Sequence, residues 1–368
     1  MSVPICPRHW QYMMWPTEIG IKPLLQYTRY KYWAIVVLVC AMPVFGEEKL
    51  QLLVWGNYVS PKVIKDFEAN TGIQVTLTPF RDDQQRTQLM SASPHTYDLI
   101  LLDRSTIPHY RDLGWISPLN LDQIPNRRHL NTQWIAPEDY GLAYAWGTVG
   151  IAYRADLLEK PPTRWADIFE LSEALKGKVI IIDQAEELFM ATFKYMGLSV
   201  KDLSLNNIDL AFEILKSQRP LVHYVTPSLD KSNGFVSGEF TAGMFYNGDT
   251  AFLQNTYNRN IHFALPSDGC ILWADYWAVL ADAPNSINAH RFINYINSPT
   301  VARDNALFLS YATPNTKAQA LLPAAIRQNT IIYPKESMLE HCEFFESIPP
   351  KFSRELNQAF FMLSGTPH

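Results

Sequence analysis

The feature that most constrains the fold is a regular alternation of strand-like and helix-like segments. In the N-terminal half, apolar strand-like runs alternate with helical segments, and the pattern returns near the middle of the chain. The strand-like runs are 50–55, 74–78, 98–102, 179–182 and 221–225, and the helical segments are 60–70, 82–90 and 184–196. Alternation of this kind produces βαβ units with parallel strands. The sequence therefore predicts an α/β fold with mainly parallel sheets flanked by helices.

The N-terminus has the pattern of a signal peptide. Arg29 and Lys31 precede an apolar stretch that ends at Phe45 and is too short to cross a bilayer. We expect export to the periplasm, with cleavage after Gly46. An uncleaved anchor, and a start at Met13 or Met14, stay open as alternatives.

The length after cleavage favours two lobes. Removing residues 1–46 from the 368 leaves 322, which is more than one hydrophobic core usually supports. There is no internal repeat and no Pro/Ser-rich linker. We therefore expect two lobes that are joined by short crossovers.

The net charge limits the classes of partner, and the cysteine content bears on disulfide formation after export. The formal net charge is −5, and residues 1–46 carry four basic side chains and one acidic one, so their removal makes the balance more acidic. An acidic surface disfavours nucleic acid and anionic membranes. Cys270 and Cys342 stay in the exported chain, where disulfides persist. One disulfide and two unpaired buried thiols are both open.

A short segment, Trp273-Ala274-Asp275-Tyr276-Trp277, sets one carboxylate among three large rings. Aromatic faces attract a desolvated ammonium, and a carboxylate supplies its counter-charge. The segment thus indicates a pocket for an organic cation. The alternative is a core strand whose rings pack inward while Asp275 caps a turn.

Motifs for enzyme classes are missing from the sequence. The nine histidines are scattered, and there is no H-E-x-x-H, G-x-S-x-G or glycine-rich phosphate loop. His341 and Cys342 are adjacent, but a zinc site needs further ligands. We expect no catalytic residue, metal or cofactor, and a secreted metal-dependent enzyme is the minor alternative.

A series of motifs along the exported chain resembles the polyamine-binding periplasmic proteins, the spermidine- and putrescine-binding group of solute-binding proteins that serve ABC importers. The series is Trp55-Gly56-Asn57-Tyr58-Val59, Thr71 to Val75, Tyr97-Asp98-Leu99, Tyr144 to Ile151, Leu175 to Lys178, Tyr246-Asn247-Gly248-Asp249, Trp273-Ala274-Asp275 and Tyr311 to Asn315. Each motif alone is weak, but their order and spacing are jointly specific.

The resemblance implies a two-lobe Venus-flytrap fold with crossings near residues 150, 275 and 319. Lobe 1 would comprise residues 47–150 and 275–319, and lobe 2 would comprise 151–274 and 320–368. The ligand would lie between the lobes. Its expected contacts are the aromatic residues Trp55, Tyr58, Tyr246, Trp273 and Tyr311 and the acidic residues Asp103, Glu187, Asp249 and Asp275.

The sequence departs from the family pattern at several acidic positions. Asn57 and Gln184 stand where relatives often carry acids, whereas Asp103 replaces a small hydroxyl residue and Ser105 stands where a tyrosine can occur. The spacing of the carboxylates must match the spacing of the ligand's amines, so moved acids change which polyamine fits. The preferred ligand therefore stays open among norspermidine, spermidine, putrescine and cadaverine.

The resemblance also implies two kinds of partner for a monomeric binding protein. Some members present their ligand state to the periplasmic domain of a membrane signalling protein of the GGDEF/EAL type, which controls cyclic-di-GMP and biofilm formation. Others deliver the polyamine to an ABC permease. The relocated acids favour the norspermidine-sensor branch, with the importer subunit as the alternative.

Overall fold

The structure, a computed structural model, describes residues 48–93, 95–131, 139–226, 228–344 and 347–365. The expected signal peptide and its cleavage site after Gly46 lie outside these ranges. Within them, no helix is both long and apolar enough to cross a membrane.

The strands carry the sheet on which the candidate site is built. They are β1 (Lys49–Trp55), β2 (Gln74–Phe80), β3 (Leu99–Asp103), β4 (Ile116–Ser117), β5 (Leu142–Arg154), β6 (Val179–Ile182), β7 (His223–Val225), β8 (Ala242–Tyr246), β9 (Ile261–Ala264), β10 (Ile271–Leu280) and β11 (Glu343–Phe344).

The helices connect these strands and cover the sheet. They are α1 (Pro61–Thr71), α2 (Asp83–Ala92), α3 (Ile107–Asp112), α4 (Ala166–Phe169), α5 (Ala185–Tyr195), α6 (Leu205–Gln218), α7 (Gly234–Ser237), α8 (Asn247–Thr256), α9 (Ser286–Ile296), α10 (Pro299–Leu309), α11 (Thr316–Leu321), α12 (Ala324–Arg327), α13 (Glu336–Leu339) and α14 (Pro350–Ser364). Short 3₁₀ turns are η1 (Leu121–Gln123), η2 (Pro125–His129), η5 (Glu173–Leu175) and η6 (Arg219–Leu221).

The predicted alternation is confirmed in both halves of the chain. The strand predicted at 179–182 has those bounds, and α5 begins directly after Gln184. Helix α2 begins after Asp82, whose side chain accepts a hydrogen bond from the backbone N–H of Gln85 at 2.7 Å. Such a cap satisfies a backbone donor that the first helical turn leaves unpaired.

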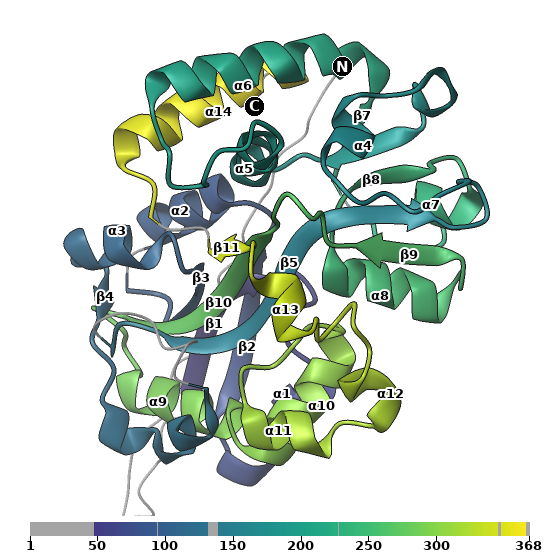
Figure 1. The fold of residues 1–368 in the computed structure, drawn as a ribbon. Coiled ribbons are helices and arrows are strands. Elements are labelled where there is room, and N and C mark those ends of the chain that lie inside the picture. Colours follow the sequence, from purple (N-terminus) through teal and green to yellow (C-terminus); the bar gives the residue numbers. More distant parts are fainter. Residues whose placement is uncertain (1–47, 94, 132–138, 227, 345–346, 366–368) are drawn as a thin grey trace, which may run out of the picture. The chain divides into compact units, whose positions relative to one another are not determined.

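The sheet is parallel at both ends and antiparallel in its middle. Its order is β2-β1-β3-β10-β5-β8-β6-β7, with β4 and β11 paired to β10 and β9 paired to β5. The β1–β2, β1–β3, β6–β7 and β6–β8 pairs are parallel, as the βαβ pattern predicts. The long strands β5 and β10 run antiparallel to each other (Figure 1). They join the two parallel parts.

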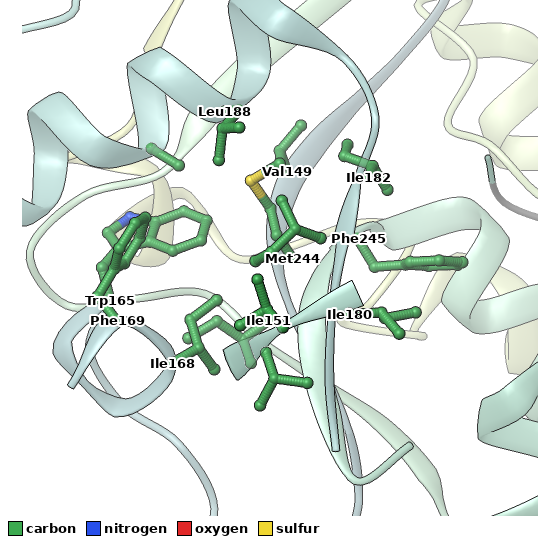
Figure 2. Close-up of a cluster of buried hydrophobic side chains, with 14 of the residues drawn as sticks. Val149, Ile151, Trp165, Ile168, Phe169, Ile180, Ile182, Leu188, Met244 and Phe245 are labelled. Carbon is green, nitrogen blue, oxygen red and sulfur yellow. The ribbon is translucent and has the colours of Figure 1, made fainter. Parts of the chain in front are cut away.

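Buried side chains form separate cores around the two parallel parts. On one side, alternate residues of β1 enter different clusters: Leu52 packs with α1 and α9, and Leu53 packs towards the opposite face. Both faces of this part are therefore covered, which explains its continuous apolar strands. On the other side, β6, β8 and the second half of β5 pack against α4 and α5 (Figure 2).

Strand β5 crosses from one core to the other. Its residue Val149 pairs with Ile271 of β10 on one edge and with Tyr246 of β8 on the other. The chain after residue 319 is divided between the cores. Ile332 lies in a cluster with β3, whereas Phe360 of α14 belongs to the cluster around β6 and β8. Helix α14 lies along α6 (Figure 1).

A disulfide joins Cys270 to Cys342, which decides between the two alternatives that the sequence leaves open. It fixes β11 beside the start of β10. The next residue, Glu343, accepts hydrogen bonds from the buried ammonium of Lys194 and, at 3.0 Å, from the backbone N–H of Val200. The C-terminal segment is thus tied covalently to β10 and by polar contacts to the end of α5.

Removing this disulfide should lower the free energy of unfolding by about 4 kcal/mol, because a cross-link over 72 residues of sequence restricts the unfolded chain. Urea unfolding of the oxidised protein and of a Cys270→Ser/Cys342→Ser variant measures the difference. Added reductant should not change the double variant. Equal unfolding midpoints for the oxidised protein and the double variant would show that the bond contributes nothing.

Candidate active surface: a tyrosine–carboxylate cluster

Three tyrosine hydroxyls donate hydrogen bonds to three carboxylates at the junction of the two cores. Tyr58 Oη lies 2.6 Å from Asp275 Oδ2, and Tyr246 Oη lies 2.9 Å from Glu187 Oε1. Tyr311 donates to Asp249 Oδ1. We call these three pairs, together with Trp273, the tyrosine–carboxylate cluster. The structure thus brings together seven of the residues predicted for the site.

Trp273 lies between two tyrosines of the cluster. Its ring centroid is 4.9 Å from that of Tyr311 and 6.1 Å from that of Tyr246, at interplanar angles of 84° and 88°. Asp275 is two residues further along β10, and side chains two apart on a strand share a face. Ring faces and a carboxylate therefore line the same side of the strand.

The other two rings of the Trp273–Trp277 segment are core residues. Tyr276 and Trp277 are fully buried, and the Trp277 ring packs edge-on against Phe292. The sequence predicted a pocket in which all three rings of this segment surround the carboxylate. In the structure, only Trp273 belongs to the cluster.

Two glycines allow the rings to approach the backbone. A Cβ atom on Gly147 of β5 would lie 2.5 Å from the Trp273 ring. A Cβ atom on Gly248, in the first turn of α8, would lie 2.1 Å from the Tyr311 ring. Both distances are far inside van der Waals contact, so any larger residue would displace a ring of the cluster.

The turn after β1 presents Tyr58. Asn57 has a φ of +57°, a left-handed conformation that asparagine tolerates better than most residues. An asparagine therefore suits this position better than most other residues would. The carbonyl of Tyr58 accepts a hydrogen bond from Tyr144 Oη at 2.6 Å, and Asn305 Nδ2 donates to the same hydroxyl at 2.6 Å.

Tyr144 is a supporting residue that sequence reasoning missed. Asp275 pairs with Ala145 and Tyr276 pairs with Ala143, so Tyr144 is the extra residue of a bulge in β5. Bulges redirect side chains and often adjoin functional sites. Tyr144 lies in one of the motifs quoted above, but its role depends on pairing between strands that are far apart in sequence.

Burial makes the carboxylates of the cluster weak acids. It raises the pKa of Asp275 to about 7, although the hydrogen bond from Tyr58 opposes the shift. It also raises the pKa of Glu187 to about 7 and that of Asp249 to about 6, against the hydrogen bonds from Tyr246 and Tyr311. Each acid would gain from a nearby positive charge, because a cation stabilises its ionised form.

Asp103 lies beside the cluster, with its backbone paired to that of Asp275 across β3 and β10. It accepts hydrogen bonds from Ser105 and Thr106 and forms an ion pair with Arg86. Burial alone would raise the pKa of Asp103, but Arg86 and these hydrogen bonds outweigh it and lower the pKa. Asp103 therefore already has a protein cation beside it.

Trp55 ends β1 and packs on Phe80, with ring centroids 4.4 Å apart. Phe80 in turn contacts the guanidinium of Arg86, whose carbon lies 5.4 Å from the ring centroid. Trp55 is half-buried and lies at the same edge of the sheet as Asp103 because β1 and β3 are parallel neighbours.

The chemistry of the cluster suits an organic cation. Carboxylates accept hydrogen bonds from ammonium groups, and aromatic faces cover methylenes and attract the positive charge. Among the residues that the structure describes, no group of three or more His, Cys, Asp or Glu side chains has the geometry to hold a metal ion.

Comparison with known proteins places the chain in a family. The model of the bacterial extracellular solute-binding proteins matches residues 62–333. The chain belongs to this family.

Relatives match the chain over most of its length. A norspermidine sensor from Vibrio cholerae serotype O1 is 30% identical over 304 residues, which are 79% of this chain and 82% of the relative. A spermidine/putrescine-binding periplasmic protein from Escherichia coli K12 is 28% identical over 297 residues, 79% of this chain and 84% of the relative.

Solved structures share the fold. A protein from Listeria monocytogenes, provisionally named a spermidine/putrescine ABC transporter, has a TM-score of 0.80 and 26% identity over 86% of this chain and 99% of that one. The substrate-binding protein PotD from Streptococcus pneumoniae, with a TM-score of 0.74 and 22% identity over the same shares, supports the fold alone. The α/β fold of the solute-binding proteins, which the sequence predicts, is confirmed.

In this solute-binding protein the cluster is assembled from both cores. Tyr311 belongs to the core around β1 and α9, and Glu187 lies on α5, which packs in the core around β6 and β8. Tyr246 and Trp273 pack against both cores. A ligand held by the cluster would therefore contact both halves of the molecule.

Proposed function

We propose that this chain is a periplasmic polyamine-binding protein whose ligand is held by the tyrosine–carboxylate cluster. The observation that carries the proposal is a set of three carboxylates, the buried Asp275 and the half-buried Glu187 and Asp249, each of which accepts a hydrogen bond from a tyrosine hydroxyl beside Trp273. The names of the Vibrio cholerae and Escherichia coli relatives support the class of ligand.

The ligand and the cluster complement each other. A polyamine is a chain of methylenes with several ammonium groups, so it needs both counter-charges and apolar cover. A buried ammonium without a counter-charge would cost several kcal/mol, and the carboxylates of the cluster lower that cost. The cation–π attraction of a desolvated ammonium to a tryptophan face adds about 2 kcal/mol.

In this proposal, ligand binding favours closure of two lobes. The boundaries expected from the family are 47–150 with 275–319 and 151–274 with 320–368. The core contacts of Ile332 favour placing the segment up to β11 with the first lobe and α14 with the second. Because the cluster draws on both cores, the ligand gains contacts in the closed form that it lacks in an open one.

The closed form is then presented, by a monomer, to the periplasmic domain of a membrane signalling protein of the GGDEF/EAL type, which controls cyclic-di-GMP and biofilm formation. The similarity to the norspermidine sensor supports this role. The alternative, a substrate-binding subunit of an ABC importer, is supported by the similarity to the spermidine/putrescine-binding proteins.

Calorimetry on refolded, ligand-stripped protein tests the ligand class. We expect micromolar or tighter binding of at least one triamine among spermidine and norspermidine, compared with putrescine, cadaverine and spermine. The absence of binding to every amine would reject the proposal while leaving the fold unchanged.

Deletion of the gene separates the two partners. Loss of a cyclic-di-GMP response to norspermidine with unchanged uptake of labelled spermidine would support the sensor. Loss of uptake alone would support the importer subunit.

Replacing Trp273 with alanine should weaken binding of every polyamine about 30-fold, which corresponds to loss of a cation–π contact worth about 2 kcal/mol. Calorimetry with two diamines and two triamines measures the effect. Tyr333→Phe, at a tyrosine whose hydroxyl accepts the backbone N–H of Thr313 at 3.2 Å outside the cluster, is the control. A loss confined to one ligand would mean that the ring selects among polyamines.

A further inference from the structure

A buried arginine lies next to the tyrosine–carboxylate cluster. The Arg86 side chain on α2 is 1% exposed, and its guanidinium carbon lies 5.4 Å and 5.6 Å from the ring centroids of Phe80 and Tyr110. It pairs with the half-exposed Asp83 at 3.0 Å and with Asp103 Oδ2 at 3.5 Å. An arginine so enclosed carries a permanent charge in a fixed position.

Both oxygens of the Asp103 carboxylate are engaged by protein groups. Its Oδ1 accepts hydrogen bonds from the Ser105 hydroxyl and, at 2.8 Å, from the backbone N–H of Thr106. Its Oδ2 accepts the Thr106 hydroxyl at 2.6 Å and faces Arg86 Nη2. A carboxylate offers about four lone-pair sites, and three of them accept these hydrogen bonds while the ion pair with Arg86 neutralises the charge.

Asp275 has a different environment although it is the neighbour of Asp103. The two residues are directly opposite each other in the antiparallel pairing of β3 and β10, and such pairs share a face of the sheet with Cβ atoms about 5 Å apart. Asp275 accepts the Tyr58 hydroxyl and keeps lone pairs for a further donor. One acid of this pair is thus engaged by the protein, and the other is available to a ligand.

We infer that Arg86 is a built-in cation that occupies the place of one ligand ammonium at Asp103, and that it thereby limits the site to polyamines with no more than three ammonium groups. This inference rests on the proposed function and concerns its selectivity. Asp103 then acts as a positioning residue that holds Arg86, whereas Asp275, Glu187 and Asp249 receive the ligand. A tetraamine would bring its fourth ammonium against the guanidinium, and like charges in a buried site repel strongly.

The first test compares two asparagine variants in the full exported protein, with spermidine as the probe in calorimetry. Asp103→Asn should change the spermidine dissociation constant less than about threefold, because this acid accepts no hydrogen bond from the ligand. Asp275→Asn should weaken it by at least about 100-fold. Equal losses in both variants would show that Asp103 contacts the ligand, which overturns the inference.

The second test measures selectivity. Arg86→Met removes the charge but retains bulk, and it frees Asp103 for a fourth ammonium. The ratio of spermine to spermidine affinity should rise at least about tenfold over the wild type, and the Arg86→Met/Asp103→Asn double variant should return to the wild-type ratio. An unchanged ratio in folded Arg86→Met protein overturns the inference.

The experiment also covers a variant that fails to fold and a wild-type protein that lacks binding or selectivity. If Arg86→Met does not fold, as judged by circular dichroism, Arg86→Lys replaces it, since a lysine keeps the charge without the two-nitrogen geometry. Wild-type selectivity against spermine in that variant supports the built-in cation, and loss of selectivity overturns it. If wild-type protein binds no polyamine, the proposed function fails first. If it binds spermine as tightly as spermidine, only the inference fails.

Discussion

Replacing Asp275 with asparagine should abolish polyamine binding, lowering affinity about 1,000-fold. Removing one partner of a buried charge pair costs about 3–5 kcal/mol, because the other charge stays buried without compensation. Asp275 is 7% exposed and lies on β10, the strand that links the two cores. Few positions in the cluster combine such burial with a place between both halves of the molecule.

The same substitution should leave the fold intact. Burial disfavours the ionised form of Asp275 in the ligand-free protein, so the carboxylate does not stabilise the empty state. The matched control is Asp98→Asn, at a fully buried acid that accepts the backbone N–H groups of Gln51 and Asn285. The control should lose stability and keep its affinity. Calorimetry and thermal unfolding measure both, and retained spermidine affinity in Asp275→Asn would remove this residue from the site.

Polyamine affinity should fall about 100-fold between pH 8 and pH 6. The reason is that the acids must be ionised to bind ammonium groups, and each pKa unit corresponds to about 1.4 kcal/mol. In the ligand-free protein, burial raises the pKa of Asp275 and Glu187 to about 7 and that of Asp249 to about 6. A bound cation lowers these pKa values, so binding releases protons in this range.

The charges around Asp275 support this direction. Its pKa is raised mainly by burial and further by Asp103 and Asp83, while Tyr58 and Arg86 lower it. The folded ligand-free protein binds protons more tightly than the unfolded chain at these acids. Their contribution to stability therefore improves as the pH falls from about 8 to 6, while affinity weakens. Opposite trends in stability and affinity exclude general acid unfolding as the cause.

Calorimetry in two buffers with different ionisation enthalpies counts the protons released. Asp249→Asn should reduce the pH dependence between pH 6 and pH 5, because it removes the acid with a pKa of about 6. Affinity that stays constant from pH 8 to pH 6 would mean that the acids are already ionised in the empty site.

Much of the architecture was predictable from the sequence. The predicted strand 179–182 and the helix after Gln184 appear with nearly the predicted bounds, since apolar runs and capping residues act over a few neighbouring positions. The antiparallel strands β5 and β10 were not predicted from that pattern. Their pairing joins residues more than a hundred positions apart, and local periodicity carries no information about such partners.

The candidate site shows the same division. Aromatic and acidic motifs pointed to Trp273, Asp275 and Asp249, because a cation pocket needs rings and counter-charges whatever the fold. Only the tertiary structure decided which carboxylates keep lone pairs that accept no hydrogen bond from the protein. Asp103 and Asp275 look alike in the sequence, yet Asp103 accepts hydrogen bonds from Ser105 and Thr106 and pairs with Arg86, whereas Asp275 accepts only a tyrosine hydroxyl among the side chains described.

The sequence by itself determined the family, the alternation of strands and helices and the types of residue that a polyamine requires. Only the tertiary structure decided the pairing of Cys270 with Cys342, the support of Tyr58 by Tyr144 and the place of Arg86 beside Asp103. Composition and spacing are local properties of the chain. Hydrogen bonds, burial and charge pairing depend on distances between atoms that folding alone brings together.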